Sequence, residues 1–86
     1  MSAAILEIQA TPNPNAMKFV LDRALFAETV SFYNPADARA NPIASQLMAI
    51  PGVTHVMLLG DFVTVGKQSK ARWSDINGHV KRIMAL

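Results

Sequence analysis

Few side chains in this 86-residue sequence have the types and spacing that metal chemistry requires. The sequence contains no cysteine, so thiolate metal sites, cysteine nucleophiles and disulfides are excluded. A metal would have to be bound by the two histidines and six carboxylates. His55 and His79 fall on different predicted elements, and neither is followed by a second ligand at the i+3 or i+4 spacing of helical metal motifs. We therefore expect no native metal site.

Motifs for nucleophilic, acid–base and phosphate chemistry are also missing. No elbow motif surrounds the candidate serines, which are Ser31, Ser45, Ser69 and Ser74. Asp61 has the character of a turn residue, and a lone carboxylate is weak support for acid–base catalysis. The four glycines form neither a G-x-G-x-x-G motif nor a P-loop. We expect no catalytic residues and no enzyme activity.

Positive charge is concentrated in the last quarter of the sequence. Residues 1–65 carry three basic and five acidic side chains, and residues 66–86 carry five basic and one acidic. This asymmetry permits an acidic partner, although a solvated helix face would have the same composition. Nucleic acid is an alternative, with Trp73 or Tyr33 available for stacking, but Trp73 also fits an apolar helical stripe. The basic residues are Lys67, Lys70, Arg72, Lys81 and Arg82.

Length and composition indicate one domain, residues 1–86, with 51% hydrophobic and 16% charged residues. No apolar run approaches the ~20 residues that span a bilayer. The N-terminal "MSAAILEIQA" lacks the basic region, sustained apolar stretch and cleavage site of a signal peptide. We therefore expect a cytoplasmic protein that does not insert into a membrane.

The first third of the chain predicts a β-hairpin with a stiff connection. Ile5–Ala10 alternates loosely, which predicts a strand with Leu6 and Ile8 on one face. Thr11–Asn15, "TPNPN", disfavours helix because each proline fixes its own φ and favours an extended residue before it. Met17–Asp22 predicts the second strand. The connection is short, so the two strands should pair antiparallel.

The middle of the chain predicts an additional strand and a short helix. Glu28–Asn34 alternates as a half-buried strand would. Asn41 followed by Pro42 is typical of an N-cap and a first helical residue. Pro51 and Gly52 then end the helix after two to three turns.

The last third predicts a second hairpin and a second helix. Val53–Lys67 turns at Gly60 and Asp61, a pair that suits a tight primed turn. Its strands are almost continuously apolar, so we expect them to be central and at least partly covered on both faces. A final amphipathic helix begins near Trp73. We assign three aromatic residues to the core: Phe19, Phe62 and Trp73.

The predicted order is β-β-β-α-β-β-α. It indicates an α+β two-layer sandwich, in which two helices pack against a mostly antiparallel sheet.

The segments "TPNPNAMKFVLD", "NPIASQLMAIPGV" and "LLGDFVTVGK", followed by a tryptophan, resemble the Nfu/NifU N-terminal domain. This domain is the amino-terminal module of a family of iron–sulfur cluster scaffold and carrier proteins. The resemblance runs from about Ile5 to Met84. Some positions depart from the family pattern, which often has Ser-Pro-Leu-Ala in place of Asn-Pro-Ile-Ala and Thr-Lys in place of Gly66-Lys67.

The resemblance implies an accessory, protein-binding role in iron–sulfur cluster assembly or delivery. Family members that hold a cluster do so through a CxxC motif in a separate C-terminal domain, and these 86 residues contain none. We expect the chain to bind no cofactor directly and to meet a cluster only through a partner. That partner would be an iron–sulfur carrier, an apo-client protein or a separate CxxC domain. An orphan interaction domain in another pathway, or a small basic protein associated with nucleic acid, is the alternative.

We expect the partner-facing surface to include the Thr11–Asn15 loop. A stiff loop loses little conformational entropy on binding, whatever its structural role as a connection. The predicted patch comprises Asn13, Asn15 and Lys18, extended by Asp61 and Lys67.

Overall fold

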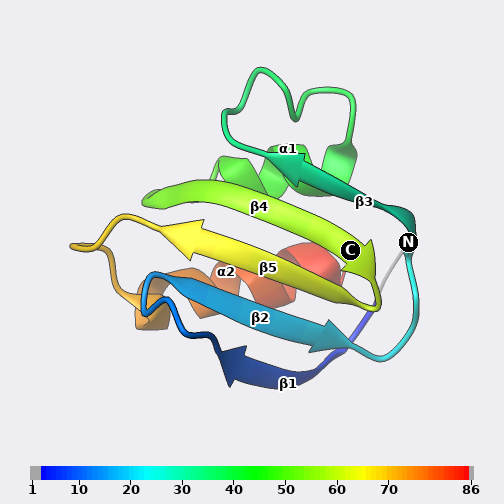
Figure 1. Ribbon diagram of the computed structural model, residues 1–86, viewed down its shortest axis with the longest axis horizontal. Helices are drawn as coiled ribbons and strands as arrows, with labels where there is room; N and C mark the ends of the chain where they lie inside the picture. The colour runs from blue at the N-terminus through cyan, green and yellow to red at the C-terminus, as the bar shows by residue number, and fades with distance from the viewer. Residues whose placement is uncertain (1–2, 86) are drawn as a thin grey trace.

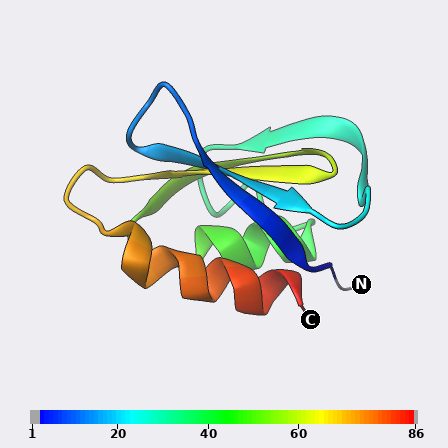
Figure 2. The same cartoon turned by 90° about the horizontal axis from the view of Figure 1, so that it is seen from below.

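A computed structural model describes residues 3–85 as a five-stranded antiparallel sheet with two helices on one of its faces (Figures 1 and 2). The strand order across the sheet is β1-β2-β5-β4-β3. The predicted α+β fold and the predicted order of elements are confirmed. The elements are β1 (Ile5–Ala10), β2 (Ala16–Leu21), β3 (Phe26–Phe32), α1 (Pro42–Met48), β4 (Val53–Gly60), β5 (Phe62–Lys67) and α2 (Trp73–Met84).

A β-bulge in β1 changes which of its side chains face the core. The pairing of β1 with β2 shifts between Ile5 and Glu7, so Leu6 is an extra residue in the ladder. Because one extra residue reverses the alternation, Ile5 and Ile8 both pack against the core. Leu6 is 68% exposed. The prediction that Leu6 and Ile8 share a face was therefore wrong.

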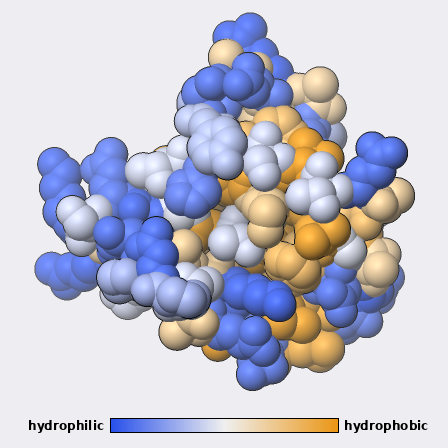
Figure 3. All heavy atoms as spheres, in the orientation of Figure 1, coloured by the Kyte–Doolittle hydropathy of each residue, from blue (hydrophilic) through white to orange (hydrophobic). Residues whose placement is uncertain are grey.

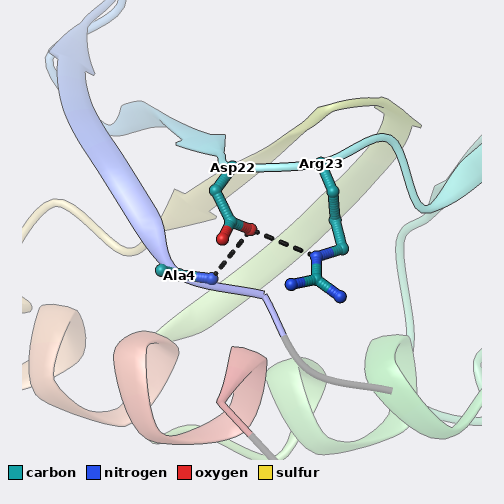
Figure 4. A network of polar contacts seen from close by, with 3 residues as sticks. All are labelled: Ala4, Asp22 and Arg23. Atoms are coloured by element: carbon teal, nitrogen blue, oxygen red, sulfur yellow. Dashed lines mark hydrogen bonds and ion pairs between the residues drawn. The ribbon is translucent and has the colours of Figure 1, made fainter.

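Asp22 closes the open end of the β1–β2 hairpin (Figure 4). Its Oδ1 accepts a hydrogen bond from the Ala4 N–H at 3.1 Å and lies 3.4 Å from Nε of Arg23. Its own N–H donates to the Ala4 carbonyl at 2.9 Å. Beside it, the N–H of Ala3 donates to the Met84 carbonyl at 2.7 Å, which joins the start of the hairpin to the end of α2.

The third strand lies two residues earlier than its predicted range. Phe26 pairs with Gly60 and packs against the core, which brings the segment before Glu28 into the sheet. After Phe32 the chain turns, because Asn34 Oδ1 accepts a hydrogen bond from the Asp37 N–H at 2.9 Å. β3 is an edge strand, and most of its residues are exposed.

The predicted turn and helix signals are confirmed in detail. Gly60 has φ of +55°, and Asp61 has a negative φ, as in a type II′ turn. Asn41 caps α1, with its side chain accepting from the Ala44 N–H at 3.1 Å, and Pro42 occupies the first turn. Gly52 follows α1 with φ of +92°, a conformation that favours glycine.

The core lies between the sheet and the two helices. The second hairpin is central in the sheet, as predicted. Figure 2 shows both helices below the sheet and none above it, so within residues 3–85 no helix covers its other face, contrary to the expectation of at least partial cover on both faces. The largest fully buried side chains are Phe19, Leu21, Leu47, Leu58, Ile76, Met84, Val56, Val63, Val65 and Val80.

Phe62 faces away from the core, contrary to prediction. Val63 and Val65 point toward the helices, so the alternation of β5 places Phe62 and Thr64 on the open face. Phe62 pairs with Val20 of β2 and with Leu59 of β4. Figure 3 shows this open face, with a hydrophobic centre bordered by hydrophilic residues.

Candidate docking surface at the Thr11–Asn15 loop

Hydrogen bonds within the Thr11–Asn15 loop fix its shape. The Thr11 hydroxyl lies 2.8 Å from the Asn13 carbonyl oxygen and 3.0 Å from that of Ala16, and it accepts from the Asn13 N–H at 3.2 Å. Asn13 Oδ1 accepts from the Asn15 N–H at 2.9 Å. In this Asx arrangement, the asparagine side chain bonds the backbone of its own loop. Asn13 itself is exposed, so its remaining amide donors face solvent.

The loop is also attached to β5 and to the start of α2. Lys67 Nζ donates to Asn15 Oδ1 at 3.1 Å, and the Lys67 N–H donates to the Asn15 carbonyl at 2.8 Å. Trp73 Nε1 donates to the Pro14 carbonyl at 3.2 Å. The Lys67 ammonium lies 5.6 Å from the centre of the Trp73 ring, within the range of a cation–π contact. Two segments, 52 and 59 residues away in the sequence, therefore hold the loop.

The five predicted patch residues do not form one surface. Asn13, Asn15 and Lys67 lie together at the loop. Asp61 lies on the β4–β5 turn, at the other end of β5 (Figure 1), which for a six-residue strand is roughly 20 Å away. Lys18 lies on the open sheet face, with Nζ 4.2 Å from the centre of the Phe62 ring. The docking role of each residue stays a prediction.

The sequence did not reveal the part that Trp73 plays at this loop. Its ring packs edge-on to Phe19, with centroids 6.4 Å apart, which agrees with the predicted core position. Its N–H points to Pro14, 59 residues away in the chain. An indole packed against a core usually finds an acceptor for this group, but helical spacing alone does not say which one.

The basic residues of the last quarter are not one cluster. Lys67 is turned to the loop, where it also donates to the carbonyls of Gln68 at 3.2 Å and Ser69 at 3.4 Å. The other four basic residues are exposed along or just before α2: Lys70, Arg72, Lys81 and Arg82.

The two histidines occupy separate structural settings. His55 stacks on Tyr33, with centroids 5.8 Å apart, and its ring lies so close to Gly66 that a Cβ there would overlap it. His79 Nδ1 accepts from a guanidinium nitrogen of Arg82 at 2.7 Å. Within residues 3–85, no three side chains of His, Asp or Glu come together as metal ligands would. The donor groups described here therefore do not fit a metal ion or an iron–sulfur cluster.

No helix within residues 3–85 combines the length and apolar character needed to cross a membrane.

Known proteins resemble this chain over most of its length. The family model "Scaffold protein Nfu/NifU N terminal" matches residues 6–86. An NFU1 iron–sulfur cluster scaffold homolog from Drosophila erecta is 38% identical over 77 residues, which are 87% of this chain and 27% of that protein. The human homolog of the same name is 41% identical over 66 residues, 76% of this chain and 26% of that protein.

Two solved structures have a similar fold. A crystal structure of Staphylococcus aureus protein SAV1430 superposes with a TM-score of 0.79 at 23% identity, covering 93% of this chain and 96% of that one. A solution structure of a NifU-like protein from Saccharomyces cerevisiae has a TM-score of 0.72 at 25% identity, covering 92% of this chain and 75% of that one.

The chain spans about a quarter of the length of the scaffold relatives that it matches, 27% and 26% in the two cases above. The region of similarity includes the Thr11–Asn15 loop, the β4–β5 hairpin and α2, because the family match covers all of them. Over residues 6–86, the chain belongs to the Nfu/NifU N-terminal family.

Proposed function

We propose that this chain is a non-catalytic protein-binding module in iron–sulfur cluster assembly or delivery. The observation that carries the proposal is the match of residues 6–86 to the N-terminal part of a scaffold family, with relatives named as iron–sulfur cluster scaffold homologs. The partner would be an iron–sulfur carrier, an apo-client protein or a separate CxxC domain.

In this proposal the cluster is cargo that stays on the partner. Clusters are held by cysteine thiolates, in some cases with histidine. The sequence has no cysteine, and His55 and His79 lie on different elements with different neighbours. The module would therefore recognise the protein that bears the cluster or receives it.

The Thr11–Asn15 loop is the proposed contact. Its conformation is fixed before binding by its own hydrogen bonds and by those from Lys67 and Trp73. Binding through such a loop costs little ordering entropy. The exposed amide of Asn13 offers donors that no bond within the described residues uses.

The test is capture of partners from native lysate with Asn13→Asp. Aspartate keeps the oxygen that accepts from the Asn15 N–H, but it loses the amide donors and adds a negative charge. Asn41→Asp is the matched control, because it makes the same chemical change and keeps the α1 cap, for which Asp and Asn are equally suited. We expect the wild-type chain and Asn41→Asp to enrich iron–sulfur carriers or apo-clients, and Asn13→Asp to enrich them several-fold less.

The capture is carried out with and without nuclease, at low and moderate salt, and bound proteins are identified by mass spectrometry. If the wild-type chain enriches no iron–sulfur protein, the proposed function is wrong. If enrichment is seen only without nuclease and is lost on nuclease treatment, the partner is nucleic acid. Equal capture by Asn13→Asp and wild type would exclude the amide donors of Asn13 as the contact.

A further inference from the structure

A groove runs along α2 on the helical side of the molecule. One cleft of about 320 Å³ lies between the end of α1 and the second half of α2, and a second of about 330 Å³ lies between Gly52 and the start of α2. Pro51 lines both clefts, so they adjoin. The two helices lie side by side on the same face of the sheet (Figure 2). We call these two adjoining clefts together the α1–α2 groove.

Apolar side chains line the side of the α1–α2 groove formed by the connection between α1 and β4, whereas Asp75 and His79 of α2 lie between its two ends. Ala49 and Pro51 are exposed there, above the buried side chains of Ile50 and Ile83. At the other cleft, Ala71 is half-buried beside Pro51. A partner that covers this strip would remove apolar surface from water, which favours binding.

The two ends of the groove are cationic. Lys70 and Arg72 line one end and Arg82 lines the other, against a single carboxylate, Asp75. In the part of the chain that the structure describes, the only ion pair is the one between Arg23 and Asp22, so none of the three cations at the groove is neutralised by a paired carboxylate. The hydrogen bond to His79 holds the Arg82 guanidinium at the groove edge.

We infer that the α1–α2 groove binds an acidic peptide segment of a partner protein, with a short apolar centre and carboxylates on both sides. The inference rests on the proposed protein-binding function and adds the chemistry of the partner. Arg82 comes ten positions after Arg72. At the rise of an α-helix, this places the two residues about 15 Å apart along the helix axis. An extended peptide covers this distance in about four to five residues, at roughly 3.3 Å each.

The composition of the groove favours a peptide over nucleic acid. Single-stranded nucleic acids bind through basic grooves that also carry aromatic side chains for base stacking. No Phe, Tyr or Trp side chain lines either cleft, and the one imidazole there, His79, is hydrogen-bonded to Arg82. Trp73 packs against Phe19 and donates to Pro14, and Tyr33 stacks on His55. Apolar surface between cations matches apolar side chains between carboxylates.

The experiment is an NMR titration of the full chain with the capped peptide Asp-Glu-Leu-Pro-Val-Leu-Glu-Asp at low salt. We expect the amide signals of Gly52, Ala71 and His79 to shift, and those of Val20 and Thr64 on the open sheet face to stay in place. Arg72→Glu and Arg82→Glu should each weaken binding by roughly threefold to tenfold, as expected for reversing one exposed charge contact. Arg39→Glu is the matched control, because it changes net charge equally on an exposed residue that precedes α1 and does not line the groove.

Several results would overturn the inference. They are absence of binding at millimolar peptide, equal binding of a peptide with lysine in place of each acidic residue, and equal weakening by Arg39→Glu. Tighter binding of an eight-nucleotide deoxythymidine strand to the same amides would assign the groove to nucleic acid.

The lysate capture separates this inference from the proposed function. If Arg72→Glu and Arg82→Glu retain the iron–sulfur partners, the groove inference fails and the proposed function stands. If the peptide binds in the groove but the wild-type chain captures no iron–sulfur protein, the proposed function fails and the groove remains an acidic-peptide site.

Discussion

At the scale of single residues, two side chains from the last quarter of the chain control a loop near its start. Lys67 bonds the side chain of Asn15, and Trp73 bonds the backbone of Pro14. Lys67 thereby acts as a structural cation, whereas Lys70, Arg72 and Arg82 are exposed to solvent at the groove. Basic residues in the last quarter of the chain therefore have two roles: one holds a loop, and the others face solvent at the groove.

Trp73→Phe tests the attachment of the loop. Phenylalanine keeps an aromatic ring against Phe19 but removes the hydrogen bond to Pro14. We expect the free energy of unfolding to fall by about 0.5–1.5 kcal/mol, the net value of a typical hydrogen bond. Amide hydrogen exchange at Asn15 should become faster, because the loop loses one of its attachments.

Tyr33→Phe is the control, since it removes a polar group from an aromatic residue that is 72% exposed. Its stability should stay within about 0.5 kcal/mol of wild type. Unchanged exchange at Asn15 in Trp73→Phe would show that the indole bond does not hold the loop.

At the scale of elements, α1 and the connection to β4 depend on local signals at both ends. Asn41 and Pro42 begin the helix, and Gly52 turns the chain into β4 with a positive φ. A Cβ on Gly52 would lie 2.7 Å from the Cβ of Ala71. This connection also forms part of the α1–α2 groove, so its geometry matters for the proposed binding.

Gly52→Ala should lower stability by about 1–3 kcal/mol, because alanine would be strained at this φ and would also crowd Ala71. Urea denaturation followed by circular dichroism measures the change. Gly66→Ala is the matched comparison, since the three atoms nearest to its Cβ would all belong to the movable ring of His55. We expect Gly66→Ala to displace that ring from Tyr33 and to change stability by less than about 1 kcal/mol. Equal losses in the two variants would refute this account of Gly52.

At the scale of the whole molecule, the sheet has one packed face and one open face. Phe19 is fully buried under the helices. Phe62, which has the same side chain, lies on the open face beneath Lys18. The two-layer architecture therefore assigns different energetic roles to two phenylalanines on neighbouring strands.

Phe19→Ala should cost about 3–5 kcal/mol, because it leaves a cavity in the core. Phe62→Ala should cost less than half as much, since the removed ring is already partly in contact with water. Denaturant unfolding of both variants measures the difference. The slope of the unfolding free energy against denaturant concentration should be the same for both. Similar losses would mean that the open face is covered by something that residues 3–85 do not provide.

Local sequence signals determined most element boundaries in this protein. The Asn41–Pro42 cap, the Gly60–Asp61 turn and the two prolines of the Thr11–Asn15 loop act on residues within a few positions. For this reason β1, α1, both strands of the second hairpin and α2 lie where the sequence predicts them. The motif segments likewise identify the family without any tertiary contact.

Only the tertiary structure decided which faces are buried and which polar residues meet. The bulge at Leu6 reverses the alternation of β1, and the helices cover one face of β5, which leaves Phe62 on the other. The bond between Lys67 and Asn15 joins residues 52 positions apart, whereas the length of β5 separates Lys67 from Asp61. Backbone preferences act over a few residues, but pairing, burial and contact depend on where distant segments pack, so these features could not be predicted from local pattern alone.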